Sequence, residues 1–233
     1  MYRKRARVDV DADLSGTRSR VAALYADLRG FSNWSETQPL DRVAQLMKAQ
    51  IERVMGICNE HRHSFHKFLG DGFVLLWEPR SPEALPDALS SALEAAFQVH
   101  WSFWQLTRKL DYPLPSGYGI GIAVGEAIRI QSDAEINGLC EVDFVGYPLN
   151  CAARMQTLAS GYSTVVCSNT VRLLEGDPGR FLEAKPGQGR RLVPPERDMI
   201  DRAALTKGLK PEDRRQFRYL SFVEGAHLPW HVA

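Results

Sequence analysis

Residues 24–32 of the chain read Leu-Tyr-Ala-Asp-Leu-Arg-Gly-Phe-Ser, and the interpretation of the whole sequence starts from them. The apolar run over residues 21–26 predicts a strand, and the glycine turn after Asp27 predicts the start of a helix. The free backbone amides at a helix start can hold a phosphate group. Asp27 is therefore expected where a strand ends and where an anion can bind.

A second aspartate stands in a comparable place. Residues 68–72 read Phe-Leu-Gly-Asp-Gly between apolar runs at 65–69 and 73–77, which predicts a hairpin with Asp71 at its tip. Two carboxylates at rigid strand ends suit Mg²⁺ or Mn²⁺, the ions that accompany nucleoside triphosphates. The same residues also fit a purely local role, because aspartate beside glycine is common in turns and helix caps.

A third motif adds a polar face. Residues 142–155 read Val-Asp-Phe-Val-Gly-Tyr-Pro-Leu-Asn-Cys-Ala-Ala-Arg-Met. Pro148 at a first helical position predicts that a helix begins there, so Asn150 and Arg154, four residues apart, share one face. An amide and a permanent cation are then expected to point into one cleft.

In this order, the three motifs resemble those of the class III nucleotidyl cyclases. That family carries a metal-binding aspartate in an F/Y-A-D-x-x-G-F-S/T segment, a second one in G-D, and an N-x-A-x-R helix. Residues 119–126 (Gly-Ile-Gly-Ile-Ala-Val-Gly-Glu) resemble its G-I-x-x-G strand, and residues 205–208 with 217–220 resemble its closing K-G turn and final strand. The resemblance spans residues 20–223, nearly the whole chain.

The resemblance implies a role for each matching residue. Two Mg²⁺ or Mn²⁺ ions would be held by Asp27, the carbonyl of Leu28, and Asp71. Asn150 would orient the ribose, and Arg154 would stabilise the charge that builds at the α-phosphoryl group. The β and γ phosphates would be received by the amides of Gly30, Phe31 and Ser32 together with Lys207. In the family, one protomer supplies the metal ligands and the other supplies the asparagine and the arginine, which implies a homodimer with two composite sites.

The base-reading positions of adenylate-type members are matched by Lys67 and Asp143. A donor and an acceptor suit N1 and the amino group of adenine, and equally O4 and N3–H of uracil, and we expect this pair to exclude guanine better than uracil. A catalytic domain with only a short tail looks like the standalone pyrimidine cyclases of the bacterial antiphage systems known as Pycsar, in which cyclic UMP or CMP activates a separate effector. We therefore expect UTP as the substrate, with ATP as the alternative.

Composition supports an ordinary globular domain. The chain has 233 residues, 44% of them hydrophobic and 24% charged, with a formal net charge of +1. A near-neutral chain gives no support for a nucleic-acid partner, and hence none for a polymerase palm domain.

No stretch approaches the ~20 apolar residues of a membrane span and no signal peptide is evident, so we expect a cytoplasmic protein without a membrane partner. An inactive cyclase-like nucleotide-binding module would lack a metal ligand or the arginine, and neither is missing.

The remaining signals are structural. Cys58, Cys140, Cys151 and Cys167 show no C-x-x-C spacing and are expected to be reduced, buried thiols rather than a zinc site. The histidine cluster at 61, 63 and 66 is expected to be structural or solvated, since no cysteine or carboxylate stands at ligand spacing.

The sequence predicts an α+β fold with a ferredoxin-like cyclase core, in which helices flank a mainly antiparallel sheet. Helices are expected over 40–57, 84–110 and 168–174, and further strands over 118–124, 164–167 and 181–184. We expect an irregular excursion over 186–211 within the catalytic domain at 20–223, an N-terminal extension at 1–19 and a C-terminal tail at 224–233.

Overall fold

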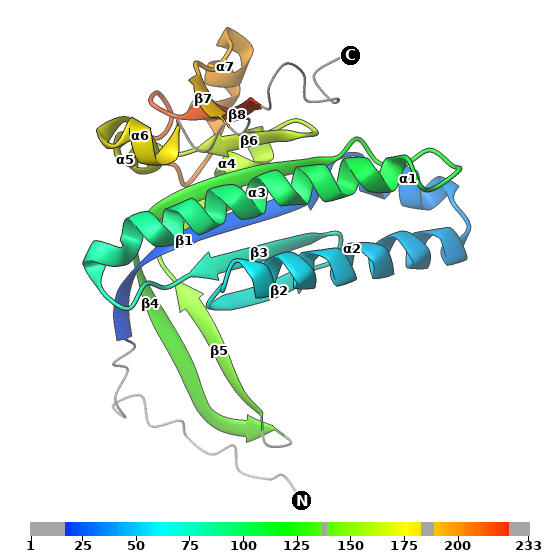
Figure 1. Cartoon of the computed structure of the whole chain (residues 1–233), viewed down its shortest axis with the longest axis horizontal. Helices are drawn as coiled ribbons and strands as arrows, with labels where there is room; N and C mark the ends of the chain where they lie inside the picture. The colour runs from blue at the N-terminus through cyan, green and yellow to red at the C-terminus, as the bar shows by residue number, and fades with distance from the viewer. Residues whose placement is uncertain (1–16, 137–138, 183–188, 224–233) are drawn as a thin grey trace, which may run out of the picture.

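The computed structural model describes residues 17–136, 139–182 and 189–223, and these form one sheet flanked by helices (Figure 1). The strand order is β2-β3-β1-β4-β6-β8-β7, and β5 pairs with β4 off this path. Only the β4–β6 pairing is parallel among the pairings within these residues. The predicted α+β fold with a mainly antiparallel sheet is confirmed. The strands are β1 (Thr17–Leu28), β2 (Phe65–Leu69), β3 (Gly72–Trp77), β4 (Tyr118–Ile136), β5 (Leu139–Val145), β6 (Ser163–Val166), β7 (Gly189–Val193) and β8 (Arg218–Val223).

The helices cover both faces of this sheet. The described helices are α1 (Phe31–Thr37), α2 (Leu40–Glu60), α3 (Leu85–Thr107) with the 3₁₀ turn η1 (Pro82–Ala84) before it, α4 (Tyr147–Leu158), α5 (Ser168–Gly176), α6 (Pro178–Phe181) and α7 (Arg197–Leu205). The predictions over 40–57, 84–110 and 168–174 correspond to α2, α3 and α5. None of these helices combines the length and the hydrophobicity of a membrane span.

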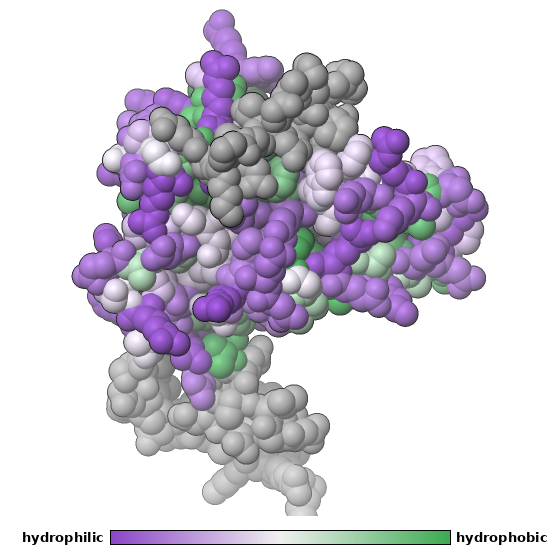
Figure 2. All heavy atoms as spheres, viewed as in Figure 1, coloured by the Kyte–Doolittle hydropathy of each residue, from purple (hydrophilic) through white to green (hydrophobic). Residues whose placement is uncertain are grey.

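The alternation of side chains along β1 divides the core into two parts. Leu24 and Leu28 face one cluster, which includes buried residues of α2 and α3. Val21 and Ala23 face the other cluster, which contains the apolar side of α4. Successive side chains of a strand point to opposite faces, so β1 is buried on both sides at the centre of the sheet. The outer surfaces of α2 and α3 are mostly hydrophilic, as amphipathic helices require (Figure 2).

One structural element is much longer than the sequence predicts. We expected a strand over 118–124, but β4 runs on to Ile136 and pairs with β5, which was not predicted. The β4–β5 ribbon extends away from the body of the molecule (Figure 1). Its described part exposes apolar side chains, among them Ile130 (46% exposed) and Val145 (55% exposed).

Two predictions near the C-terminal end were wrong. Phe181 does not begin a strand over 181–184 but ends α6, because Asp177 caps the amide of Arg180 and Pro178 starts the helical turn. The described part of 186–211 is not irregular, since β7 pairs with β8 and α7 buries Met199 and Ala203. Residues 17–19 belong to β1, while 1–16, 183–188 and 224–233 lie outside the described residues.

Candidate active site

The two predicted metal-binding aspartates lie at the same end of neighbouring strands. Asp27 is the second-last residue of β1, and Asp71 occupies the turn between β2 and β3, where Gly70 adopts a left-handed φ of 66°. At Gly72, a Cβ would lie 2.7 Å from the carbonyl oxygen of Ala26 and 3.1 Å from Oδ1 of Asp27. A glycine is therefore needed for the hairpin tip to approach the end of β1, and this approach brings Asp71 towards Asp27.

The charges of the two carboxylates interact. Burial, and after it the neighbouring charge of Asp27, raise the pKa of the Asp71 carboxyl. Two close carboxylates with like charge form a site that favours a cation, and their oxygen donors suit Mg²⁺ or Mn²⁺. Leu28, whose carbonyl the resemblance assigns as a further ligand, is the last residue of β1. The residues present thus fit the divalent ions that the sequence implies.

Arg29 also reaches this end of β1, and sequence reasoning assigned no role to it. Its Nη1 donates to Oδ2 of Asp27 at 3.3 Å, and its Nη2 donates to the backbone carbonyl of Gln156 in the last turn of α4. A cation is therefore already beside one of the two carboxylates.

A separate cavity of about 280 Å³ brings three other predicted residues together. Lys67 of β2, Asp143 of β5 and Asn150 of α4 all line it, with the aromatic side chains of Tyr25 and Phe65. The Nζ of Lys67 lies 3.3 Å from Oδ2 of Asp143. Residues that are far apart in the sequence thus form one polar recess, and neither Asp27 nor Asp71 lines it.

Helix α4 presents its two predicted functional residues to the outside. Asn150 and Arg154 are both exposed, whereas Cys151, Ala152 and Met155 are fully buried. A Cβ at Gly121 would collide with the carbonyl of Ala152, so α4 can lie directly on β4 only because a glycine stands there. The buried side of α4 is thus closely packed on β4, while its polar face remains open.

The comparisons with known proteins agree with this architecture. No protein-family model matches the chain. The adenylyl cyclase CyaB from P. aeruginosa superposes with a TM-score of 0.65 at 14% identity, over 91% of this chain and 97% of that chain. The guanylyl cyclase Cya2 gives 0.60 at 22% identity, over 94% and 99%. The guanylate cyclase domain of RhGC from Catenaria anguillulae in complex with GTP gives 0.59 at 14% identity, over 89% and 100%. The chain has the class III cyclase fold.

The relatives found by sequence comparison carry no functional description. Uncharacterized proteins of Mycobacterium tuberculosis and Mycobacterium bovis are each 26% identical over 162 residues, which is 68% of this chain and 27% of each relative. The chain thus spans about a quarter of the length of the curated relatives it matches.

Within this class III cyclase fold, the loop that carries Lys207 lies next to Arg154. Gly208 has a left-handed φ of 88°, and a Cβ there would lie 4.0 Å from Nε of Arg154. Lys207 itself is exposed. The structure therefore places the predicted phosphate-binding lysine in the loop that adjoins the predicted transition-state arginine.

The same loop is anchored by Asp213, which is 2% exposed. Oδ1 of Asp213 accepts from the amide and the hydroxyl of Ser168 at 2.9 and 2.6 Å, and Oδ2 accepts from the hydroxyl of Tyr147 at 2.6 Å. The Tyr147 hydroxyl in turn accepts from the amide of Lys210 at 2.8 Å. One carboxylate therefore ties together the starts of α4 and α5 and the Lys207 loop.

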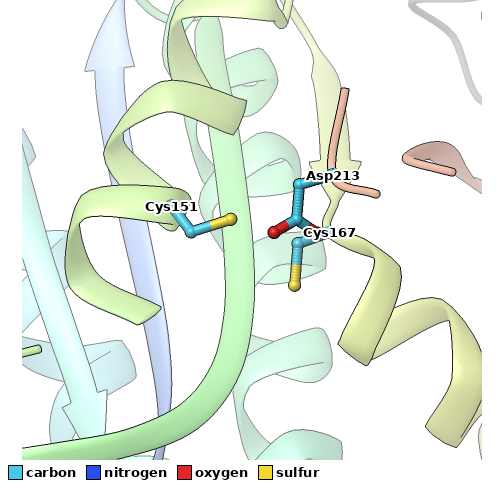
Figure 3. A group of neighbouring side chains, drawn as sticks. All are labelled: Cys151, Cys167 and Asp213. Atoms are coloured by element: carbon cyan, nitrogen blue, oxygen red, sulfur yellow. The ribbon is translucent and has the colours of Figure 1, made fainter. Parts of the chain in front are cut away.

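Two cysteines lie beside this anchor (Figure 3). The sulfurs of Cys151 and Cys167 and a carboxylate oxygen of Asp213 lie within 4.8 Å of one another, a spacing that could also suit a metal ion. We interpret the cluster as structural, because three hydrogen bonds already satisfy the carboxylate. The hydrogen bond with Cys167, together with burial, holds the pKa of the Cys151 thiol well above its usual range.

The other predicted thiols and histidines show similar packing. Cys58 is buried, which raises its pKa to about 11, and it is free, like Cys151 and Cys167. The side chain of Cys140 lies outside the described residues. His63 contacts the carbonyl of Cys58 at 3.0 Å and His66 at 2.8 Å, so both of its ring nitrogens have partners within the protein. These contacts agree with a structural role for His63 and His66.

Asp213→Ala is expected to lower the free energy of unfolding by about 3–5 kcal/mol, because buried donors on Ser168 and Tyr147 lose their acceptor at ~1–3 kcal/mol each. Urea unfolding followed by circular dichroism measures this effect. The neighbouring exposed residue provides the control, since Glu212→Ala should change stability by less than about 0.5 kcal/mol. Equal stability of the two variants would show that Asp213 is not an anchor.

Proposed function

We propose that this protein is a nucleotidyl cyclase that converts a nucleoside triphosphate into the 3′,5′-cyclic monophosphate and pyrophosphate. The single observation that carries the proposal is the cavity in which Lys67, Asp143 and Asn150 converge, in a fold whose solved examples include a guanylate cyclase domain in complex with GTP. The cavity offers a donor, an acceptor and an amide to a base and its ribose. The aspartate pair at the end of β1 supplies the charge that a triphosphate with its metal ions requires.

The reaction needs in-line attack of the ribose 3′ oxygen on the α-phosphorus while pyrophosphate departs. Bound divalent ions would lower the pKa of the attacking hydroxyl and neutralise the leaving phosphates. We assign Asp27, Asp71 and the carbonyl of Leu28 to holding two such ions, Mg²⁺ or Mn²⁺. The roles of Asn150 and Arg154 follow from their position on the open face of α4, the first orienting the ribose and the second donating to the α-phosphoryl oxygens.

The remaining phosphates need further donors. We assign this role to Lys207, whose loop adjoins Arg154, and to the backbone amides of residues 30–32 at the turn from β1 into α1. Lysine is a strong phosphate ligand, acting as a point charge.

The arrangement also supports a homodimer with two composite sites. The base cavity contains Asn150 but neither metal-binding aspartate, as expected if each substrate lies between two copies of the chain. The β4–β5 ribbon protrudes from the body with exposed Ile130 and Val145, and an apolar protruding surface is typical of a protein interface (Figure 1). We therefore propose that one copy binds the base and ribose while its partner binds the metal ions.

For the base, we propose uracil, with adenine as the alternative. Oδ1 of Asp143 accepts from the backbone amide of Phe144 at 2.8 Å, which leaves Oδ2, beside Lys67, to accept from a base. This pair offers one acceptor next to one donor, which complements O4 and N3–H of uracil. Guanine presents the same pattern with O6 and N1–H on a larger ring system, so hydrogen bonding alone separates uracil from guanine less well than we expected from the sequence.

We propose that the product is cyclic UMP, made in the cytoplasm as an antiphage signal that activates a separate effector protein.

Incubation of the protein with each of the four radiolabelled ribonucleoside triphosphates and Mn²⁺ tests the function and the base together. We expect cyclic UMP as the dominant product, and no product from Asp27→Ala. Dominant cyclic AMP would overturn the pyrimidine assignment. The absence of every cyclic product from a folded, dimeric sample would overturn the cyclase proposal.

A further inference from the structure

The side chain of Arg29 is fixed by hydrogen bonds to two different parts of the fold. Its guanidinium lies between Asp27 and the last turn of α4, where it donates to Oδ2 of Asp27 and to the carbonyl of Gln156. Its side chain is 24% exposed, against 38% for Asp27. The guanidinium is therefore partly withdrawn from water, while the Asp27 carboxylate stays accessible.

The backbone has room for this guanidinium because Gly119 lies beneath it. Gly119 is the strand partner of Asp27 in the β1–β4 ladder. A Cβ at that position would lie 2.8 Å from Cζ of Arg29, closer than real contacts allow. A larger residue at position 119 would displace the guanidinium, so the present contact of Arg29 with Asp27 depends on glycine at this position.

The guanidinium is not fully satisfied in this position. Its Nε is buried and has no hydrogen-bond partner among the described residues. An unsatisfied buried donor costs free energy, so a movement of the guanidinium that gives Nε an acceptor would be favoured. Arginine also suits phosphate oxygens, which its planar donors can bind in pairs.

The charges suggest which acceptor that is. Asp27 and Asp71 bring two negative charges, and Arg29 cancels one of them while no ligand is bound. A divalent ion that arrives alone must bind beside a fixed cation, whereas an ion that arrives with a triphosphate brings negative oxygens for that cation. Such a site prefers the metal–nucleotide complex to the free metal ion.

We propose that Arg29 is an internal counter-ion of the metal site, which pairs with Asp27 before substrate arrives, weakens the binding of free divalent ions, and donates to triphosphate oxygens once the metal–nucleotide complex is bound. The inference rests on the proposed function, because it takes Asp27 as a metal ligand. It assigns to Arg29 a role that favours binding of metal and nucleotide together.

Binding of Mn²⁺ in the absence of nucleotide tests this role without any turnover. The free Mn²⁺ signal in electron paramagnetic resonance gives the dissociation constant for the wild type, Arg29→Met and Arg29→Lys. Arg29→Met keeps most of the side-chain length but removes the charge, so it should bind Mn²⁺ about tenfold more tightly than the wild type. Arg29→Lys keeps the charge and should stay close to the wild type. Arg172→Met, on the exposed side of α5, serves as the control and should change nothing.

A second measurement separates this role from a merely structural one. The KM for the Mn²⁺–nucleotide complex should rise about tenfold in Arg29→Met even though the free ion binds more tightly, because the triphosphate loses a donor. Circular dichroism and thermal unfolding check that each variant is folded. Mn²⁺ affinity that is unchanged or weaker in folded Arg29→Met overturns the inference.

Mn²⁺ binding by the single variant Asp27→Ala, compared with Arg29→Met, distinguishes the two proposals. If Asp27→Ala removes Mn²⁺ binding but Arg29→Met does not strengthen it, the metal site stands and the inference about Arg29 fails. If Mn²⁺ binding is the same with and without Asp27, the metal site of the proposed function fails, and the counter-ion role fails with it.

Discussion

Arg154→Ala is expected to lower kcat by about 10²–10³-fold while leaving the KM for the nucleoside triphosphate within about threefold of the wild type. The reason is that Arg154 would act on charge that develops at the α-phosphoryl group during the reaction, whereas the base and the metal-bound phosphates are held by other residues. The side chain is exposed on α4, so its truncation leaves no cavity and should change stability by less than about 0.5 kcal/mol.

Initial rates over a range of Mn²⁺–nucleotide concentrations measure this effect. Arg172→Ala is a matched control, because it removes another exposed helical arginine that lies outside the proposed site. Arg154→Lys should recover part of the rate, since it restores a positive charge without the planar donors of arginine. An Arg154→Ala enzyme that raises KM but keeps kcat would show that this arginine binds the ground state rather than the transition state.

Local sequence motifs predicted the structural elements that carry the candidate site. The end of β1 at Asp27, the hairpin at Asp71 and the open face of α4 each depend on a few neighbouring residues, such as glycine at a tight turn or proline at a helix start. These signals are short-range, and the structure forms the expected elements at each of them.

The parts that were missed depend on contacts between distant residues. The length of β4 follows from its pairing with β5, and β7 forms because β8 offers an edge, which no local pattern in 186–211 reveals. Asp213 acts as an anchor because folding brings Tyr147 and Ser168 to its carboxylate, and both residues are distant from it in the sequence. The contact between the Arg29 guanidinium and Gly119 joins residues of two different segments, β1 and β4. A glycine in a strand indicates that another group packs closely there, but the sequence does not show which group it is.

The proposal that two copies of the chain share each active site predicts that two inactive variants can restore activity when they are mixed. If one copy of the chain supplies Asp27 and its partner supplies Arg154 to each site, then Asp27→Ala and Arg154→Ala homodimers each have two damaged sites. Both should fall below about 1% of wild-type activity. A mixed dimer of the two variants, in contrast, places both substitutions in one site and leaves the other site intact.

Mixing equal amounts of the two inactive variants under conditions of subunit exchange should therefore restore about a quarter of wild-type activity, because half of the dimers are mixed and each has one working site of two. Native mass spectrometry of samples tagged with different masses confirms that mixed dimers form.

Asp27→Ala mixed with Asp71→Ala is the matched control, since both residues belong to the same half of a site and each site of the mixed dimer still lacks one of them. That control should stay inactive. If Asp27→Ala with Arg154→Ala also stays inactive although mixed dimers are present, each copy of the chain must build its own site, and the division of labour between the metal aspartates and α4 is wrong.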